Sequence, residues 1–459
     1  MSSINLENLT IPKSTNCRFL LSACPELENV TLPKNATIIH SLIFGECSKL
    51  KNVDIPDTVT TIGYEAFRGC TSLENIIIPD SIKRISKCTF QDCTGLKSVT
   101  LPSSLKTIGK NAFYNCSSLE SITIPASVET IGDSAFRQCK NLTDVNIQND
   151  PTNTTSPASL KTIGPNAFKD CEKLKNINIP DSVTRIGESA FMSCTSLESL
   201  TLPDSVTRIE NEAFASCERL KNITIPDSLY YIGAHAFDGC ESLENITLPD
   251  SITEIDSFVF HGCQSFKSMI IPDSVTAIHS DAFKKCSSLE SIKIPESVDS
   301  IEWNAFKWCK KLTGITIPNG VTVISDSIFE NCENLEHIKL PDSLEDICDN
   351  AFHGCHSLKE ITLPDTLESI GKKAFCECKS LESIEIPYGT ERIGSFAFYQ
   401  CKNLKSITIP NTLYSIGNNA FSDCESLETV TIISDCTSRT IDVRGLDFVT
   451  MNRWIFLYF

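Results

Sequence analysis

The chain has 459 residues, of which 58 are acidic and 40 are basic, and its formal net charge at pH 7 is -18. This charge repels phosphate groups and therefore argues against nucleic-acid and anionic-membrane partners. Length alone predicts two or three domains, but a motif that returns every 23 residues predicts one elongated repeat array instead.

Residues 1–24 form a degenerate first copy of the motif. Pro12 is present, but Leu21 stands where later copies have phenylalanine. Terminal copies of repeat arrays are often atypical because they cap an exposed core, so we expect an N-terminal cap here. The segment lacks the basic and apolar regions of a signal peptide, and no apolar run reaches the length of a membrane span. These features predict a cytoplasmic location.

The motif predicts the secondary structure of one coil, and the copy around residues 62–85 shows it clearly. The stretch Leu73-x-x-Ile76-x-Ile78-Pro79 alternates apolar residues and ends at proline, which predicts a short strand and a turn. Ile82-x-x-Ile85 predicts a second extended piece, and Ala66-Phe67-x-x-Cys70 predicts one helical turn. Residues 25–432 are therefore predicted to form an α/β repeat solenoid of about 18 coils, with short parallel strands and one-turn helices.

Two columns of residues recur at fixed positions. Phenylalanine fills one of them in 17 of 18 copies, from Phe44 to Phe421. At about 1.5 to 3 kcal/mol per buried large side chain, this column predicts that stability comes from the stacking of neighbouring coils. Cysteine fills the other column from Cys24 to Cys424 and accounts for 18 of the 23 cysteines. We expect reduced, buried thiols, with disulfides between stacked coils as the alternative.

A third column alternates in charge. It follows the repeat leucine and begins Glu28, Lys51, Glu74, Lys97. Stacked parallel strands would place each charge beside its opposite, which contributes a few tenths of a kcal/mol per pair. This column therefore predicts the register between coils.

Two segments depart from the period. Residues 148–156 are a polar insert that delays the next proline to Pro157, and we expect them to loop out of one coil. Beyond Ile432 the pattern dissolves, and residues 433–459 are predicted to be a C-terminal cap or tail. The aromatic run at 454–459 would cover the last coil or pair with another molecule, so we expect a monomer or a weak end-to-end oligomer.

The copies diverge most around residue 300, where tryptophan and basic residues suit an interface. In five consecutive coils the usual glycine position holds Asp256, His279, Glu302, Ser325 and Cys348. Neutral drift with ordinary packing substitutions is the alternative explanation. The candidate partner-binding residues in this block are Lys293, Trp303, Trp308, His337 and Lys339.

Signatures of catalysis are absent from the sequence. It has no Gly-rich phosphate loop, Gly-x-Ser-x-Gly or His-Glu-x-x-His motif, so we predict no enzymatic activity and no cofactor. One group of residues resembles a metal site: His353, Cys355, His356, Cys376 and Cys378, in which His353 and Cys376 hold equivalent positions one coil apart. Cys355 and Cys378 belong to the buried column, which argues against a complete tetrahedral set of ligands, so no metal is predicted.

The repeat unit resembles that of the treponemal, BspA-like leucine-rich repeats, L-x-x-I-x-I-P-x-S-V-x-x-I-G-x-x-A-F-x-x-C. Leu197 to Cys217 and Leu220 to Cys240 match it nearly throughout, and the resemblance covers about residues 25–432. It implies a right-handed, curved or superhelical leucine-rich-repeat solenoid used for binding. Many relatives are surface proteins or adhesins of bacteria and protist parasites, although no signal peptide or anchor is visible in this sequence.

We therefore predict a non-enzymatic scaffold that mediates protein-protein interaction, with a protein partner, no nucleic acid and no membrane insertion. The alternative that the resemblance implies is a cell-surface antigen or adhesin that binds host or extracellular proteins. Asn-x-Ser/Thr sequons, Asn222 and Asn153 among them, would carry glycans only on an exported chain. Asn153, in the polar insert, is the one expected to be most accessible.

Overall fold

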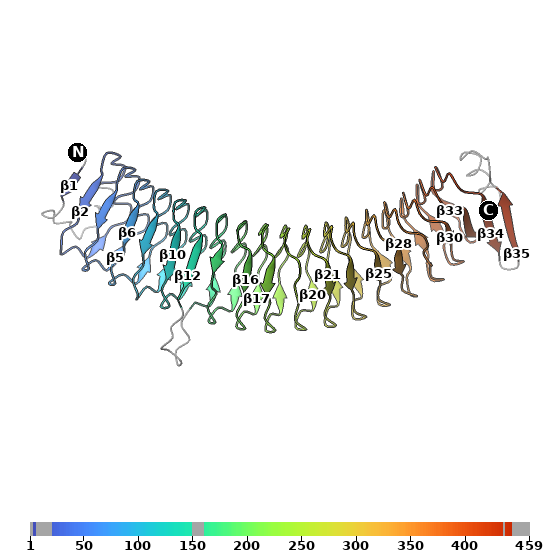
Figure 1. The fold of residues 1–459 in the computed structure, drawn as a ribbon, viewed down its shortest axis with the longest axis horizontal. Helices are drawn as coiled ribbons and strands as arrows, with labels where there is room; N and C mark the ends of the chain where they lie inside the picture. The colour runs from blue at the N-terminus through green and yellow to red at the C-terminus, as the bar shows by residue number, and fades with distance from the viewer. Residues whose placement is uncertain (1–2, 6–20, 149–159, 435–436, 443–459) are drawn as a thin grey trace. The chain divides into compact units, whose positions relative to one another are not determined.

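The protein folds into short strands that stack from coil to coil (Figure 1). The structure is a computed structural model, and it describes residues 3–5, 21–148, 160–434 and 437–442. The chain divides into two compact units, Met1–Cys240 and Glu241–Phe459. Both units are parallel stacks of coils, so the predicted repeat solenoid with short parallel strands is confirmed.

Each regular coil of the first unit contributes two strands, as the alternation of apolar residues predicted. Ile76 is buried between exposed neighbours in its strand, and Ile85 is buried in the next one. The first strands of the coils are β2 (Asn29–Thr31), β4 (Asn52–Asp54), β6 (Asn75–Ile77), β8 (Ser98–Thr100), β10 (Ser121–Ile124), β12 (Asp144–Ile147), β14 (Asn176–Ile177), β16 (Ser199–Thr201) and β18 (Asn222–Thr224). The second strands are β3 (Ile38–Ile39), β5 (Thr61–Ile62), β7 (Arg84–Ile85), β9 (Thr107–Ile108), β11 (Thr130–Ile131), β13 (Thr162–Ile163), β15 (Arg185–Ile186), β17 (Arg208–Ile209) and β19 (Tyr231–Ile232). A further strand, β1 (Ser3–Asn5), pairs parallel with β2.

The second unit repeats this arrangement. Its first strands are β21 (Ser268–Ile270), β23 (Ser291–Lys293), β25 (Gly314–Thr316), β27 (His337–Lys339), β30 (Ser383–Glu385), β32 (Ser406–Pro410) and β34 (Thr429–Ser434). Its second strands are β20 (Glu254–Ile255), β22 (Ala277–Ile278), β24 (Ser300–Ile301), β26 (Val323–Ile324), β28 (Asp346–Ile347), β29 (Ser369–Ile370), β31 (Arg392–Ile393) and β33 (Ser415–Ile416). The last described strand, β35 (Thr437–Asp442), pairs antiparallel with β34.

The register between coils follows the repeat. Ile76 of β6 pairs with Val99 of β8, 23 residues later, and the charge column forms the expected contacts between coils. Lys97 lies 2.9 Å from Glu74, and Lys405 lies 2.9 Å from Glu382. These pairs are exposed, so each contributes little to the free energy of unfolding, but they agree with one register only.

The predicted helical turn is wrong in the described residues, where no α-helix is found. The segment 65–70 consists of turns, because Glu65 and Gly69 have φ values of 55° and 71°, outside the right-handed helical region. Their N–H groups donate to the next coil, from Glu65 to Lys87 and from Gly69 to Gln91, instead of closing a helix. This segment is therefore tied to its neighbour much as a strand is.

Stacked phenylalanines form the centre of each unit. In the first unit the rings of Phe191 and Phe214 stack with centroids 5.4 Å apart, and in the second unit those of Phe283 and Phe306 do so at 5.5 Å. Nine buried phenylalanines of this column lie in the first unit and eight in the second, which corresponds to about 17 coils. The earliest of the 18 expected coils lies largely outside the described residues.

The cysteine column is buried from Cys47 to Cys424, as expected, whereas Cys24 at its start is half-buried. Its thiols do more than fill space: Cys70 donates a hydrogen bond of 3.2 Å to the carbonyl oxygen of Phe44 in the preceding coil. The same contact recurs from Cys93 to Phe67 and onward through both units. Among the described cysteines all are free.

The segments that depart from the period are described in part. The insert separates β12 from β14, and Asn178 accepts a hydrogen bond from the N–H of Ile147 and donates one to its carbonyl. Three segments lie outside the described residues: 149–159, residues 1–2 and 6–20 of the N-terminal cap expected at 1–24, and the aromatic run at 454–459. Among the described residues no helix is long and apolar enough to cross a membrane.

Candidate interaction surface

Three of the five predicted partner-binding residues lie on one exposed strand face of the second unit. Lys293 is the last residue of β23, and His337 and Lys339 are the ends of β27. Side chains alternate along a strand, and the adjacent residues Ile292 and Ile338 face inward, so the side chains of Lys293, His337 and Lys339 point away from the core. The structure therefore brings these three residues to one place.

Between them lies a shallow hollow, which we call the basic hollow. Its floor is β25, where Gly314 pairs with Ser291 on one side and with His337 on the other. A Cβ atom added to Gly314 would meet no atom nearer than the carbonyl oxygen of His337, at 3.5 Å, so the missing side chain leaves open space. The hollow has a volume of about 480 Å³. It is lined by Ile292, Lys293, Ile294, Gly314, Ile315, Thr316, His337, Ile338 and Lys339.

The electrostatics of the basic hollow differ from those of the charge column. Within the described residues no carboxylate lies in ion-pair range of Lys293 or Lys339. Thr316 separates the two lysines, which stand two strand spacings, or about 10 Å, apart. His337 is exposed and lies 3.9 Å from Glu336. The hollow thus presents two lysines that no carboxylate of the described residues pairs, on a chain whose net charge is -18.

The two tryptophans lie elsewhere. Trp303 and Trp308 belong to the turns between β24 and the repeat cysteine, outside the strand face. Half of the Trp303 surface is exposed, whereas the ring of Trp308 contacts Lys310, whose Nζ is 5.2 Å from the ring centroid. The structure therefore does not bring the predicted five residues together into one patch.

The altered glycine positions have packing partners. Glu302 accepts hydrogen bonds from the N–H and the hydroxyl of Ser280, and its other oxygen lies 2.9 Å from His279 Nδ1. Ser325 donates to the carbonyl of Ile301 in the preceding coil. Burial disfavours the charged form of His279, but its contacts with Glu302 and Glu254 outweigh this effect and raise its pKa. These contacts agree with packing substitutions more than with a binding site.

Sequence reasoning missed another cluster, on the second strands of the first unit. Glu210, at a usual glycine position, lies 2.7 Å from Arg185 and 2.9 Å from Arg208. The guanidinium of Arg208 also stacks on Tyr231, 4.2 Å from the ring centroid. Glu210 pairs with both arginines, so its single negative charge offsets one of their two positive charges. The adjacency of Arg185, Arg208 and Tyr231 at equivalent positions was the signal in the sequence that could have revealed it.

Comparison with known proteins identifies the family of this repeat. A family model described as "BspA type Leucine rich repeat region (6 copies)" matches residues 60–156, 148–242, 207–336 and 322–442. The chain belongs to the BspA-type leucine-rich repeat family. Among curated proteins, none matches the chain significantly.

Solved structures of other leucine-rich repeat proteins are similar to this BspA-type chain. A leucine-rich repeat protein from Bacteroides ovatus is 31% identical, with 87% of this chain and 86% of that chain covered and a TM-score of 0.49. A leucine-rich cell surface protein from Faecalibacterium prausnitzii is 29% identical over 72% of this chain and 84% of its own, with a TM-score of 0.43. The pneumococcal vaccine antigen PcpA is 23% identical over 79% and 84%, with a TM-score of 0.42.

Proposed function

We propose that this BspA-type chain is a non-enzymatic scaffold that binds a partner protein, and that the basic hollow receives an extended acidic segment of that partner. The fold supports the first part, because a stack of coils offers long, regular surfaces that suit protein binding. Lys293 and Lys339, which no carboxylate of the described residues pairs, support the second part.

The geometry of the basic hollow fits an extended chain. Carboxylates spaced along a strand would reach Lys293 and Lys339 on either side of Thr316, while the open space above Gly314 accepts one side chain. Because both lysines are exposed, their attraction to carboxylates acts in high dielectric and is screened by salt. Binding of such a segment should therefore weaken steeply as ionic strength rises.

A labelled peptide tests this proposal directly. The probe is a fluorescent decapeptide of alternating glutamate and valine, with a lysine-valine peptide as the control, and binding is measured by fluorescence anisotropy at two salt concentrations. Binding of the acidic peptide alone, abolished by the double variant K293E/K339E, supports the proposal. The matched control variant is K83E, because Lys83 is an exposed lysine of the first unit.

Two results would overturn the proposed site. One is failure of the acidic peptide to bind at low salt, and the other is equal binding by K293E/K339E and the unchanged chain. Unchanged thermal unfolding of the double variant is required, since both lysines are exposed and carry no packing role.

A cell-surface antigen is the second candidate function. The observation that favours it is the exposed sequon at Asn222, in β18, where an exported chain would carry a glycan. Surface labelling of intact cells together with a glycosidase mobility shift tests this function. A shift that disappears in N222Q supports export, and protection from labelling without any shift contradicts it. The sequon at Asn153 lies outside the described residues.

A further inference from the structure

We propose that His353, Cys376 and Glu377 form a binding site for Zn²⁺ or a similar transition metal across two successive coils of the second unit. One ligand atom from each of these residues lies within 4.8 Å of the others. Imidazole, thiolate and carboxylate are the donors that zinc takes in proteins, and zinc sites with three protein ligands hold water in the fourth position.

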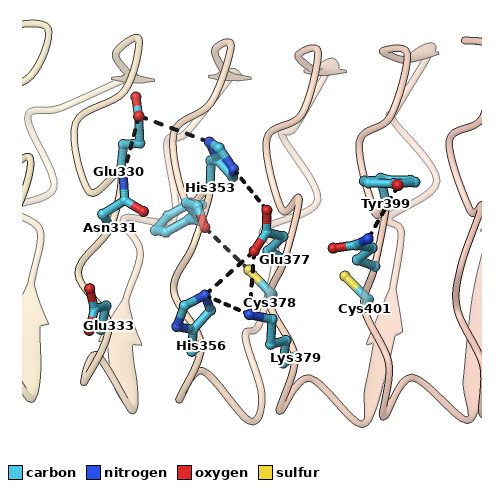
Figure 2. Close-up of polar contacts among 12 residues, drawn as sticks. Glu330, Asn331, Glu333, His353, His356, Glu377, Cys378, Lys379, Tyr399 and Cys401 are labelled. Atoms are coloured by element: carbon cyan, nitrogen blue, oxygen red, sulfur yellow. Dashed lines mark hydrogen bonds and ion pairs between the residues drawn. The ribbon is translucent and has the colours of Figure 1, made fainter.

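The repeat register brings these donors together. His353 and Cys376 hold the same position in successive coils, directly after the buried phenylalanine, and Gly354 and Glu377 hold the next position. Glu377 reaches back to the preceding coil, which carries His353 and His356. Its two oxygens lie 3.6 Å from His353 Nε2 and 3.7 Å from His356 Nε2, as Figure 2 shows. Cys376 is almost fully buried beside them.

The surroundings orient His353 for coordination through Nε2. Its Nδ1 faces Glu330 (Figure 2), 4.0 Å away. Glu330 is in turn held 2.8 Å from Lys307. A shift of about 1 Å would bring this carboxylate within hydrogen-bond distance of Nδ1. A carboxylate hydrogen-bonded there fixes the ring and the tautomer in which Nε2 carries the free electron pair. This arrangement provides an outer shell for the site without any change of fold.

A cation already lies at the edge of the cluster. The ammonium of Lys379 is 3.1 Å from His356 Nε2 and 3.3 Å from Glu377, so it occupies a place where electron pairs of both groups converge. Lys379 is partly exposed and can swing into solvent. Its departure would free the Glu377 carboxylate to bind the metal, and binding would release the thiol proton of Cys376 to solvent.

Sequence reasoning came close to this site and missed its third donor. Cys355 and Cys378 donate their thiol protons to backbone carbonyls in the cysteine column, which removes them as ligands, as expected. Glu377 was not considered, because the repeat gave no reason to expect a carboxylate that reaches back across a coil.

Cobalt provides the test. Co²⁺ is titrated into the full chain under reducing conditions, and absorption is followed in the near ultraviolet, where thiolate-to-cobalt charge transfer appears, and in the visible range, where a tetrahedral ion absorbs strongly. We expect one equivalent of Co²⁺ to give both bands and one equivalent of Zn²⁺ to abolish them. C376S should lose the charge-transfer band, and E377Q should bind at least 10-fold more weakly. C348S is the matched control, since Cys348 is a partly buried thiol outside the cluster.

A second variant changes affinity in the opposite direction. K379M removes the competing ammonium and should tighten Co²⁺ binding several-fold, whereas E330Q should weaken it roughly 10- to 100-fold by loosening His353. The proposal is wrong if C376S keeps the charge-transfer band, if C348S loses it, or if K379M binds no more tightly than the unchanged chain. Circular dichroism of every variant before titration shows that the coils are intact.

Discussion

The thiol of Cys217 donates a hydrogen bond of 3.2 Å to the carbonyl oxygen of Phe191 in the preceding coil. The same carbonyl also accepts the N–H of Cys194, at 3.0 Å, so it has two partners. Each cysteine of the column is therefore a link between coils as well as a small buried side chain. A residue at this position needs a volume near that of cysteine and one donor.

Replacing the Cys217 thiol should show how much its hydrogen bond contributes to the free energy of unfolding. We expect C217A to lower the free energy of unfolding by about 1 to 2 kcal/mol, because the methyl group leaves a small void and removes one partner of the Phe191 carbonyl. C217S keeps a donor and should cost less than C217A. Urea unfolding under reducing conditions measures both variants, and equal losses would contradict a role for the hydrogen bond.

High pH should unfold the protein through its thiols. Burial raises the pKa of Cys217, and likewise that of Cys139, to about 12 from an ordinary value of 9.0. Below pH 9 the thiol is protonated in both the folded and the unfolded chain, so its full contribution to the free energy of unfolding is present. Above pH 9 the unfolded chain loses protons that the folded chain retains, so stability falls by about 1.4 kcal/mol per pH unit per thiol. Urea midpoints at pH 8, 9 and 10 measure the slope, and C217S should make it shallower by one thiol.

The phenylalanine column should be the most sensitive part of the core. F214A is expected to cost about 3 to 5 kcal/mol, because Phe214 is fully buried and stacks on Phe191 and Phe237. The control is I77T, since Ile77 is 72% exposed and threonine is common at that position; a change within about 0.5 kcal/mol is expected. Similar losses from the two variants, measured by chemical denaturation, would show that the column is not the main source of stability.

Two glycines should respond oppositely to alanine. A Cβ atom at Gly187 would lie 2.6 Å from the carbonyl oxygen of Ile163 in the preceding coil, so G187A should cost about 1 to 3 kcal/mol. Gly314 has open space, and G314A should leave stability unchanged or raise it by about 0.4 to 1 kcal/mol. Thermal unfolding distinguishes the two. A loss of stability in G314A would contradict the description of the basic hollow as open.

His279 and Glu302 should give the second unit a local pH dependence. Burial opposes the shifts of both groups. The contacts with Glu302 and Glu254 nevertheless raise the pKa of His279, and the hydrogen bond from Ser280, followed by the contact with His279, lowers the pKa of Glu302. The histidine contribution is present below its ordinary pKa of 6.5 and is lost as pH rises through the raised value. The glutamate contribution is present above 4.5 and is lost as pH falls through the lowered value. NMR titration should show the pKa of His279 falling in E302Q, and an unchanged value would contradict the contact.

Much of the fold was predictable because the determining signals are local and recur in step. Alternation and proline located both strands of a coil, and the charge column fixed their register. The helical turn could not be excluded from sequence, because Glu65 and its equivalents adopt a left-handed backbone that side chains rarely favour. Bonds to the adjacent coil, which no single coil reveals, hold that conformation in place.

The candidate site was predictable only in its charged residues. Lys293, His337 and Lys339 stood out as departures from a bland face, and the register placed them together. Gly314 was less visible, because an absent side chain matters only when its neighbours are known. Trp303 and Trp308 were near the others in sequence but belong to a different side of the coil, so proximity along the chain was a poor guide.

The insert at 148–156 shows what the stack requires of each coil. Phe136 and Phe168 are 32 residues apart instead of 23, yet their rings stack at 5.4 Å with planes 2° apart, within the 5.2 to 5.6 Å range of the regular pairs in the first unit. The packing of neighbouring coils thus depends on the surfaces that they present to each other, and not on the length of chain that connects those surfaces. The connection between β12 and β13 is a permissive site, where a loop, an epitope or a fluorescent reporter can be gained without any loss of order in the coils that flank it.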